Sequence, residues 1–229
     1  AGSRYAPSSP CAGLAAVEEP GVKAVFIGKP CDAAAVAALR KQRPELDKNL
    51  RFVFSFFCAG TPQTGAIRSL LAQSGVDSRA LTDLKFRGEG WPGLFAASDR
   101  NGKSCSLTYE ASWGYLSHYR PFRCQLCPAG LGELSDITCG DAWHRYRACE
   151  SDPGRSLGDG VSDPGRSLIL ARSEAGRELV QRAAAAGYIV SEPSTAQQVV
   201  EAQGMVRRRR ELHGRLQARA QLVVGVIDH

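Results

Sequence analysis

The sequence predicts an α/β protein whose mixed, largely parallel sheet is flanked by helices. Near the N-terminus a buried-strand pattern, a turn and a helical pattern occur twice in succession, beginning at Val22 and at Leu50. A third strand and helix follow from Ser167. Successive units of this kind place their strands parallel in one sheet. A hairpin and a cysteine-bearing loop come before the third unit, and we expect the loop to cross the carboxyl-terminal edge of the strands.

The first two units have clear boundaries. "VKAVFIG" from Val22 is apolar and β-branched, and "PCDAAAVAALRKQ" from Pro30 suits a helix because proline is favoured in a first helical turn. "LRFVFSFFC" from Leu50 predicts a second buried strand, which the turn "AGTP" and the helical "QTGAIRSLLAQSG" follow. Residues 1–20 are rich in Ala, Ser and Pro, so we expect an irregular segment before these units.

The hairpin and the third unit follow further along the chain. The dipeptide Asn101-Gly102 lies between two alternating segments and predicts a β-hairpin. Beyond the cysteine-bearing loop, Ser167–Ala171 predicts a strand, "EAGRELVQRAAAAG" a helix and "YIVSE" a further strand. A third strand–helix unit therefore closes the predicted core.

The C-terminal part has a different composition. From residue 194 to residue 222 the pattern predicts one long polar helix with a break at Gly204. We therefore divide the chain into a core of residues 1–193 and a basic helical tail of residues 194–229. The arginine run 207–210 is spread around this helix instead of lining one face, which is typical of a solvated tail and makes nucleic-acid binding an unfavoured explanation.

Composition limits the functional classes. The net charge of +6 over 229 residues favours an anionic partner or cofactor. Apolar runs are far shorter than the roughly 20 residues of a membrane span. The N-terminus has no signal-peptide pattern, so we expect a soluble cytoplasmic protein whose cysteines stay reduced. The chain starts at Ala1 and its single methionine is Met205, as expected of a fragment or of a trimmed product.

The placement of four cysteines suggests a metal site. Cys31 and Cys58 follow the two predicted parallel strands, and ligands of open α/β sheets bind outside that edge. If the loop that carries Cys124 and Cys127 folds over the same edge, four thiolates meet there. Four thiolates suit either tetrahedral zinc or a four-iron cluster.

Spacing alone does not choose between these explanations. Only Cys124 and Cys127 form a close pair, whereas zinc knuckles usually have two, and unrelated thiols also stay open. The other cysteines rank lower. Inert small hydrophobic residues are expected at Cys11, Cys105 and Cys149, whereas Cys139 is the hardest to dismiss as a ligand.

Several motifs in order resemble one known family. They are "AGSRYAPS", "FIGKPCDAAAVAALR", "FSFFCAGTPQTG", "FRGEGWPG", "CQLCPAGLGELSDITCGDAW" and "GRSLILARSEAGRELV". Together they cover roughly residues 1 to 190 and are similar to the beta subunit of coenzyme F420 hydrogenases and dehydrogenases, whose relatives include a plant chlorophyll reductase that acts on a hydroxymethyl group. The resemblance begins after an N-terminal segment that in the family helps to enclose a flavin, so we expect this sequence to start within the family pattern.

The resemblance implies an oxidoreductase that holds FAD and a 4Fe-4S cluster. It implies a cytoplasmic subunit that takes electrons from an iron–sulfur protein or from a hydrogenase or dehydrogenase subunit, and delivers them to a small-molecule acceptor such as coenzyme F420. The family's cysteine positions fall on Cys31, Cys58, Cys124 and Cys127. The implied flavin-binding residues are Gly28, Lys29 and Pro30 in one turn, Gly60, Thr61 and Pro62 in a second, and Arg87, Trp91 and Asp141.

Each implied flavin contact has a physical basis. A glycine-containing turn that opens a helix exposes backbone N–H groups and the positive end of the helix dipole to a phosphate. Arg87 offers a guanidinium and Trp91 an indole for stacking.

The competing hypothesis is a non-catalytic, zinc-stabilised module that binds an anionic partner through its basic tail.

Overall fold

The computed structural model describes residues 8–88, 91–143, 166–204 and 212. The described residues form two compact units. The parallel-sheet unit takes its residues from within Ser8–Ala59, Leu126–Ala142 and Ser167–His229, and the hairpin unit from within Gly60–Gln125 and Trp143–Arg166. Each unit is described by itself below.

A four-stranded sheet forms the centre of the parallel-sheet unit. Its order is β1-β2-β6-β7, and its strands are β1 (Ala24–Gly28), β2 (Leu50–Phe56), β6 (Ile137–Asp141) and β7 (Ser167–Ala171). Strands β1, β2 and β6 run parallel, while β7 pairs antiparallel with β6 at the edge. The predicted mixed, largely parallel sheet is therefore confirmed.

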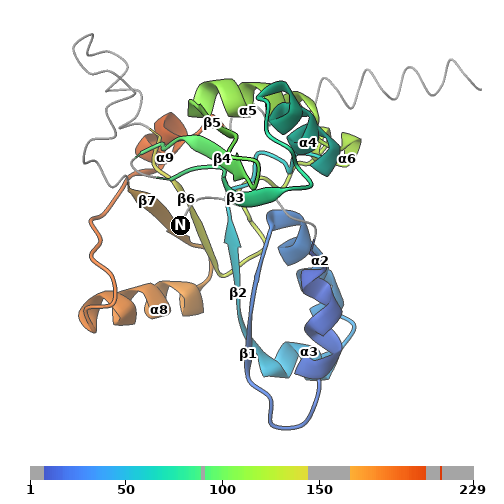
Figure 1. Cartoon of the computed structure of the whole chain (residues 1–229). Coiled ribbons are helices and arrows are strands. Elements are labelled where there is room, and N and C mark those ends of the chain that lie inside the picture. The colour runs from blue at the N-terminus through green and yellow to red at the C-terminus, as the bar shows by residue number, and fades with distance from the viewer. Residues whose placement is uncertain (1–7, 89–90, 144–165, 205–211, 213–229) are drawn as a thin grey trace, which may run out of the picture. The chain divides into compact units, whose positions relative to one another are not determined.

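Two helices cover one face of this sheet. Helix α2 (Pro30–Arg40) packs on β1 and β2, and α3 (Pro44–Asn49) packs on β2, as Figure 1 shows. Alternate strand residues such as Phe26 and Val53 point into this layer and are only 6% and 2% exposed. This alternation is what a strand period of two requires when one face is buried.

The N-terminal segment is more ordered than its composition predicts. A 3₁₀ helix (Pro10–Gly13) leads into the short helix α1 (Leu14–Val17), and Leu14 is 4% exposed within the core beside α3. The expectation of an irregular segment is therefore wrong for these residues. A proline at the helix start and one apolar side chain that packs into the core are sufficient to form these short helices.

Two further helices belong to the parallel-sheet unit. They are α8 (Glu174–Ala185), where a helix was predicted, and α9 (Ala196–Ala202). Gly176 lets α8 approach the sheet, since a Cβ there would lie 2.3 Å from the carbonyl oxygen of Asp136. The predicted long C-terminal helix begins as α9 but ends before Gln203, whose backbone is extended. The rest of that prediction, apart from the buried helical residue Leu212, lies outside the described residues.

The predicted strand "YIVSE" is wrong. Residues 188–192 form no strand in the structure, and Tyr188 and Val190 are 85% and 103% exposed. In the described part of the chain no strand lies beside these residues. High β-propensity describes a fit to a pleated, half-buried surface, and this segment has no such surface to join.

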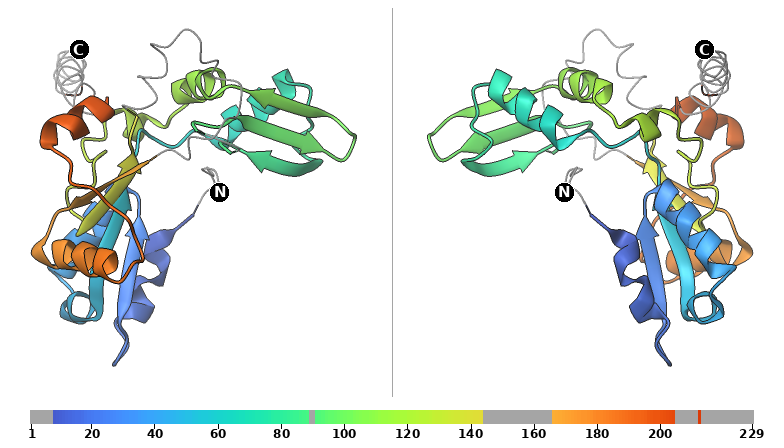
Figure 2. Two further views of the ribbon diagram at one scale, coloured as in Figure 1. Left: turned by 90° about the vertical axis from the view of Figure 1, so that its left-hand side faces the viewer. Right: turned by 90° about the vertical axis from the view of Figure 1, so that its right-hand side faces the viewer.

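The hairpin unit has an antiparallel sheet of β3 (Leu81–Lys85), β4 (Phe95–Asp99) and β5 (Ser104–Leu107). The predicted hairpin turn is confirmed between β4 and β5, with Gly102 at a φ of 77°. Helix α4 (Thr64–Gln73) was predicted; α5 (Tyr109–His118) and the short α6 (Phe122–Gln125) were not. Figure 2 shows α4 beside this sheet.

A separate core holds the hairpin unit together. One apolar cluster is formed by the buried side chains of α4 and β4 together with Val76, Phe86 and the helix residue Leu116. Phe95 is fully buried and its ring meets Phe86 edge to face, at 5.6 Å between centroids. No described helix in either unit is long and apolar enough to cross a bilayer.

Candidate functional site

Two of the predicted metal-binding cysteines follow neighbouring parallel strands. Cys31 is the second residue of α2, three positions after β1 ends at Gly28, and Cys58 comes two positions after β2 ends at Phe56. Because β1 and β2 are paired and parallel, both cysteines lie at the carboxyl-terminal edge of the sheet. This is where open α/β sheets bind their ligands.

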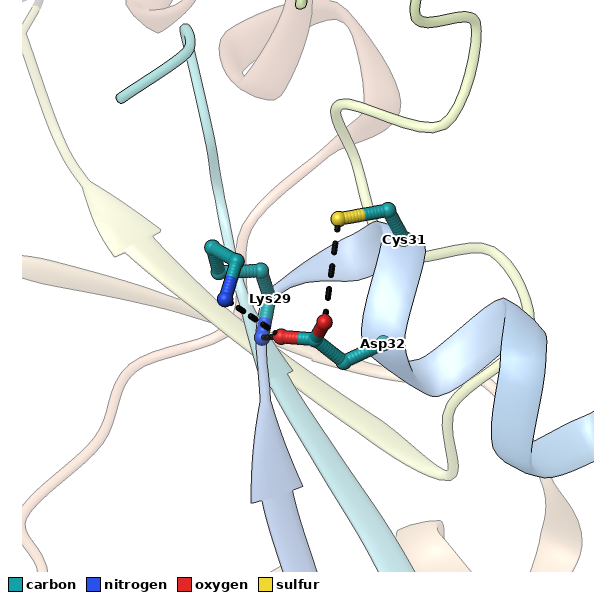
Figure 3. A network of polar contacts seen from close by, with 3 residues as sticks. All are labelled: Lys29, Cys31 and Asp32. Atoms are coloured by element: carbon teal, nitrogen blue, oxygen red, sulfur yellow. Dashed lines mark hydrogen bonds and ion pairs between the residues drawn. The ribbon is translucent and has the colours of Figure 1, made fainter. Parts of the chain in front are cut away.

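Lys29 and Asp32 form a polar network with Cys31 (Figure 3). The ammonium Nζ of Lys29 lies 2.7 Å from Oδ2 of Asp32, and the backbone N–H of Lys29 donates to the same oxygen at 3.1 Å. The Cys31 thiol lies 3.9 Å from the other carboxylate oxygen. The carboxylate therefore caps the helix and holds the lysine side chain beside the first cysteine.

The pKa of Lys29 reports on its surroundings. Partial burial acts to lower this pKa, but the hydrogen bond and charge of Asp32 raise it, and the charges of Cys31 and Cys58 raise it further, so the net shift is upward. The amine therefore lies within electrostatic reach of both cysteines. A raised pKa keeps Lys29 positively charged beside two potential thiolates, where it would offset part of their negative charge.

The loop that carries Cys127 is attached to the end of β2. The backbone N–H of Cys58 donates to the carbonyl oxygen of Gly130 at 3.0 Å, and Arg172 Nη2 donates to the carbonyl oxygen of Leu131 at 2.8 Å. Cys127 itself is half-buried. The expected fold of this loop over the strand edge is thus borne out within the parallel-sheet unit.

Cys124 lies in helix α6, which belongs to the hairpin unit. Its backbone N–H donates to the carbonyl oxygen of Pro121 at 2.8 Å. Gly60 has a φ of 115°, and a Cβ at Gly60 would lie 3.3 Å from the Cβ of Cys124 and 2.5 Å from Cδ of Arg120. Glycine is therefore required at this turn, both for the backbone conformation and for the close approach of α6.

The remaining described cysteines have other surroundings. Cys11 and Cys105 pack against the two separate apolar cores, as expected of small hydrophobic residues. Cys139 lies on β6, and desolvation raises the pKa of its thiol, which disfavours the thiolate form that binds metals. Cys149 lies outside the described residues. Among the residues that are described, no three His, Cys, Asp or Glu side chains are gathered closely enough to hold a metal ion.

The first turn predicted to contact a flavin is tightly packed. A Cβ at Gly28 would lie 2.5 Å from Cε1 of Phe26 and 3.1 Å from the Cβ of Asp32, so glycine is needed there for packing. Pro30 is buried and begins α2. The charge of Lys29 is directed to Asp32 in this structure, an arrangement the sequence pattern did not indicate.

The second turn leads into α4. Gly60 is buried, Thr61 is half-buried, and Pro62 is buried. The following residue, Gln63, donates its backbone N–H to the carbonyl oxygen of Tyr119 at 3.0 Å. The start of α4 is therefore joined to the end of α5 within the hairpin unit.

Arg87 and Trp91 are brought together, with two further rings that the sequence did not single out. The guanidinium carbon of Arg87 lies 4.8 Å from the ring centroid of Trp91, 5.6 Å from that of Trp143 and 5.9 Å from that of Tyr109. Nε of Arg87 donates to the carbonyl oxygen of Pro92 at 3.2 Å. The aromatic residues thus hold the cation by cation–π contacts.

The rings of this cluster also contact one another. Trp91 and Trp143 lie 4.9 Å apart, and Tyr109 and Trp143 lie 5.0 Å apart, between centroids. Nε1 of Trp91 is buried and has no hydrogen-bond partner within the described structure. A buried indole N–H normally finds an acceptor, so this donor fits a ligand oxygen or a water.

Asp141 is the last residue of β6. Its backbone pairs with Ser167 of β7, and its carbonyl oxygen accepts a hydrogen bond from the side chain of Gln203, just after α9. The backbone of Asp141 therefore connects the sheet edge to the C-terminal helix. The carboxylate of Asp136 accepts hydrogen bonds through both oxygens, from the backbone N–H of Val53 and from the hydroxyl of Ser173.

Comparisons with known proteins identify the family and agree with the fold. Residues 22–197 match the model of a family described as the C-terminal part of the coenzyme F420 hydrogenase/dehydrogenase beta subunit. Among curated proteins none matches the sequence. A solved structure of the xenon-derivatised F420-reducing nickel–iron hydrogenase complex from Methanosarcina barkeri is similar, with a TM-score of 0.66 and 16% identity, over 96% of this chain and 70% of that chain. At this identity the likeness shows the fold, and it agrees with the α/β sheet described above. The chain therefore belongs to the coenzyme F420 hydrogenase/dehydrogenase beta-subunit family, as its motifs predict.

Proposed function

We propose that this chain is an iron–sulfur flavoprotein subunit that passes electrons from an external donor through a 4Fe-4S cluster and FAD to an organic acceptor such as coenzyme F420. One observation carries the proposal: Cys31 and Cys58 follow two paired parallel strands, at the edge where open α/β sheets bind their ligands, in a chain of this family. Oxidoreductase chemistry follows from the family relationship to hydrogenase and dehydrogenase subunits.

We assign the cluster to Cys31, Cys58, Cys124 and Cys127. The donor atoms suit the group, because four thiolates are what a four-iron cluster requires, although no three of these described cysteines are gathered closely enough to hold a metal ion in the structure. Cys58 is hydrogen-bonded to the loop that carries Cys127, and the side chain of Cys124 lies against Gly60, two residues after Cys58 along the chain. Lys29 would lower the negative charge around the sulfurs and so favour the reduced cluster.

We assign FAD to the residues around the two glycine turns and the aromatic cluster. Arg87 is fixed in place by its three rings, and the buried N–H of Trp91 offers a donor for a flavin or ribose oxygen. The tight packing at Gly28 would bring the backbone close to a phosphate. The full set is Gly28, Lys29, Pro30, Gly60, Thr61, Pro62, Arg87, Trp91 and Asp141.

The cluster and the flavin, when bound, would supply the electron and hydride chemistry. The chain's own residues would set geometry and charge. Cys31 and Cys58 are fixed by the ends of two paired strands, and within the hairpin unit the aromatic rings fix the position of the Arg87 guanidinium. The donor would be an iron–sulfur protein or another hydrogenase or dehydrogenase subunit, which agrees with the similarity to a chain of a hydrogenase complex.

The test is electron transfer by the reconstituted protein. The chain is loaded anaerobically with iron, sulfide and FAD, reduced methyl viologen is supplied as donor, and reduction of coenzyme F420 is followed by loss of its absorbance. Cys31→Ser and Cys124→Ser should lose both the cluster spectrum and the activity. Cys105→Ser, which removes a thiol packed in the hairpin core, should keep both.

Two outcomes would contradict the proposal. A wild-type chain that binds one zinc ion and no flavin would favour the zinc-stabilised module instead. Loss of the cluster in Cys105→Ser, with retention in Cys124→Ser, would show that the ligand set is wrong.

A further inference from the structure

Two buried hydroxyl groups meet one backbone carbonyl beneath the loop that carries Cys127. The Oγ atom of Ser135 donates to the carbonyl oxygen of Gly132 at 2.7 Å, and Oγ1 of Thr138 donates to the same oxygen at 3.0 Å. The two hydroxyl oxygens lie 2.8 Å apart. We call Gly132, Ser135 and Thr138 the hydroxyl clamp. Ser135 is 6% exposed and Thr138 is fully buried.

The clamp leaves no free space between the loop and the sheet. Gly132 has a φ of 64°, and a Cβ there would lie 2.8 Å from Oγ1 of Thr138 and 3.0 Å from Oγ of Ser55. Ser55 is 3% exposed and pairs in register with Thr138 on β6. Its hydroxyl has no partner among the described residues. The loop therefore rests directly on strands β2 and β6.

The residues just after Cys127 are anchored one after another. The carbonyl oxygen of Ala129 accepts the N–H of Gly132 at 3.1 Å. The carbonyl oxygen of Gly130 accepts from the N–H of Cys58, and that of Leu131 accepts from the side chain of Arg172. The carbonyl oxygen of Gly132 accepts from the hydroxyl groups of Ser135 and Thr138. Four successive carbonyl groups are thus bonded, beginning two residues beyond the cysteine. A segment fixed in this way defines the direction in which the chain leaves Cys127.

We propose that Thr138, with Ser135, is a positioning residue for the iron–sulfur cluster: the hydroxyl clamp fixes the loop so that the Cys127 thiolate is held at its ligand position. This inference rests on the proposed function. Thr138 would act through Gly132 and the loop backbone, without contact to iron. A preorganised ligand is released less often, so the clamp should slow the loss of the cluster.

The test compares Thr138→Val, which replaces the hydroxyl by a methyl group of similar size, with Thr138→Ser, which keeps the hydroxyl. Each full-length protein is reconstituted anaerobically with ferrous iron and sulfide. Iron release to a chelator is then timed, and the electron paramagnetic resonance spectrum of the reduced cluster is recorded. We expect Thr138→Val to lose iron about 10- to 100-fold faster and to show an altered spectrum, as is typical when an outer-shell partner is removed. Thr138→Ser should restore both.

The matched control is Ser112→Ala. Ser112 is 3% exposed in helix α5, and its hydroxyl donates to the carbonyl oxygen of Thr108 at 2.9 Å, so this change removes an equally buried hydroxyl from the other unit. It should leave iron release unchanged. Ser135→Ala serves as a second clamp variant if Thr138→Val does not fold.

A readout without iron follows the clamp itself. In the apo protein, hydrogen exchange of the segment 126–136 should be faster in Thr138→Val than in wild type, and unchanged in Ser112→Ala. Both readouts are needed, because faster exchange without faster iron release would make the clamp merely structural.

The results separate the two claims. A wild-type chain that takes up no iron overturns the proposed function together with this inference. A wild-type cluster with the same release rate and spectrum in Thr138→Val overturns the positioning role alone. Equal acceleration in Thr138→Val and Ser112→Ala would also overturn it, because general loss of stability would then explain the effect.

Discussion

Asp136 and Val53 are joined by two hydrogen bonds that attach the end of the Cys127 loop to the middle of β2. The backbone N–H of Val53 donates to Oδ2 of Asp136 at 2.8 Å, and the backbone N–H of Asp136 donates to the carbonyl oxygen of Val53 at 2.8 Å. The other carboxylate oxygen accepts from Ser173 Oγ at 2.6 Å. One carboxylate thus links β2, the start of β6 and the start of α8.

Asp136→Asn should destabilise the protein. An amide has one acceptor oxygen in place of two, so its NH₂ group must face either Val53 N–H or Ser173 O–H, both of which donate. A donor left unpaired there should lower the free energy of unfolding by about 1–3 kcal/mol. Urea unfolding measures this. Asp83→Asn, at an exposed carboxylate, should change stability by less than about 0.5 kcal/mol, and an equal loss in both variants would contradict the role of Asp136.

Gly132→Ala should cost more stability than Gly75→Ala. Both glycines have positive φ angles, 64° and 77°, and alanine in that conformation costs about 1–2 kcal/mol. At Gly75 a Cβ would meet nothing within 4 Å, whereas at Gly132 it would press on Thr138 and Ser55. Crowding of this kind adds about 1–3 kcal/mol. Similar losses in the two variants, measured by urea unfolding, would show that the loop is not packed as described.

The stability of the hairpin unit should depend on the ionisation of Asp99. Backbone N–H groups of Asp77, Lys103 and Asn101 donate to its carboxylate, and these bonds, that from Asp77 foremost, hold the pKa of Asp99 below its usual value. A depressed pKa contributes stability that is present above the unfolded pKa of about 3.9 and is lost as the pH falls through the folded pKa.

Asp99→Asn should therefore lower the melting temperature at pH 7. This difference should shrink as the pH falls from about 4, where the unfolded carboxylate becomes protonated, through the lower pKa of the folded carboxylate. Thermal unfolding followed across pH measures both effects. Asp83→Asn, at a carboxylate with few contacts, should show no comparable trend. A difference between Asp99→Asn and wild type that persists at the lowest pH would mean that charge is not the source of the effect.

Arg87 and Trp143 should be energetically coupled. The guanidinium lies 5.6 Å from the indole centroid, and half-buried cation–π pairs contribute about 0.5–2 kcal/mol. A double-mutant cycle with Arg87→Met and Trp143→Leu, followed by urea unfolding, should give a coupling free energy in this range. The same cycle with the exposed Arg79→Met should give a coupling near zero. Additive effects of Arg87→Met and Trp143→Leu would contradict the contact.

Local sequence signals were sufficient for the elements that carry them. A few residues were enough to predict the conformation of several elements. They are the strands β1 and β2, the start of α2 at Pro30 and the turn at Asn101-Gly102. The same signals placed Cys31 and Cys58 at one edge, because parallel pairing of adjacent units follows from topology. The close spacing of Cys124 and Cys127, in a loop expected over the same edge, suggested the other two cysteines, and the family resemblance implied the same four.

Other features depend on tertiary contacts that no local pattern encodes. Helix α5 contains Gly114 and several aromatic residues without a clear period. It begins at Tyr109, and the side chain of the preceding Thr108 caps it by accepting from the N–H of Ala111. The rings of Tyr109 and Trp143 meet Arg87 only after folding, since they are distant in sequence. The segment "YIVSE" has the composition of a strand, but among the described residues no strand lies beside it, so composition alone gave a wrong prediction.

The most direct test of the central claim is the cofactor content of the protein. The chain is purified without oxygen, and iron, acid-labile sulfide, zinc and flavin are measured on one sample together with its visible spectrum. We predict a brown protein with about four irons and four sulfides per chain, which shows flavin bands once FAD is added. A colourless protein with one zinc and no affinity for FAD would contradict the account, and would mean that the fold has been kept without its electron-transfer chemistry.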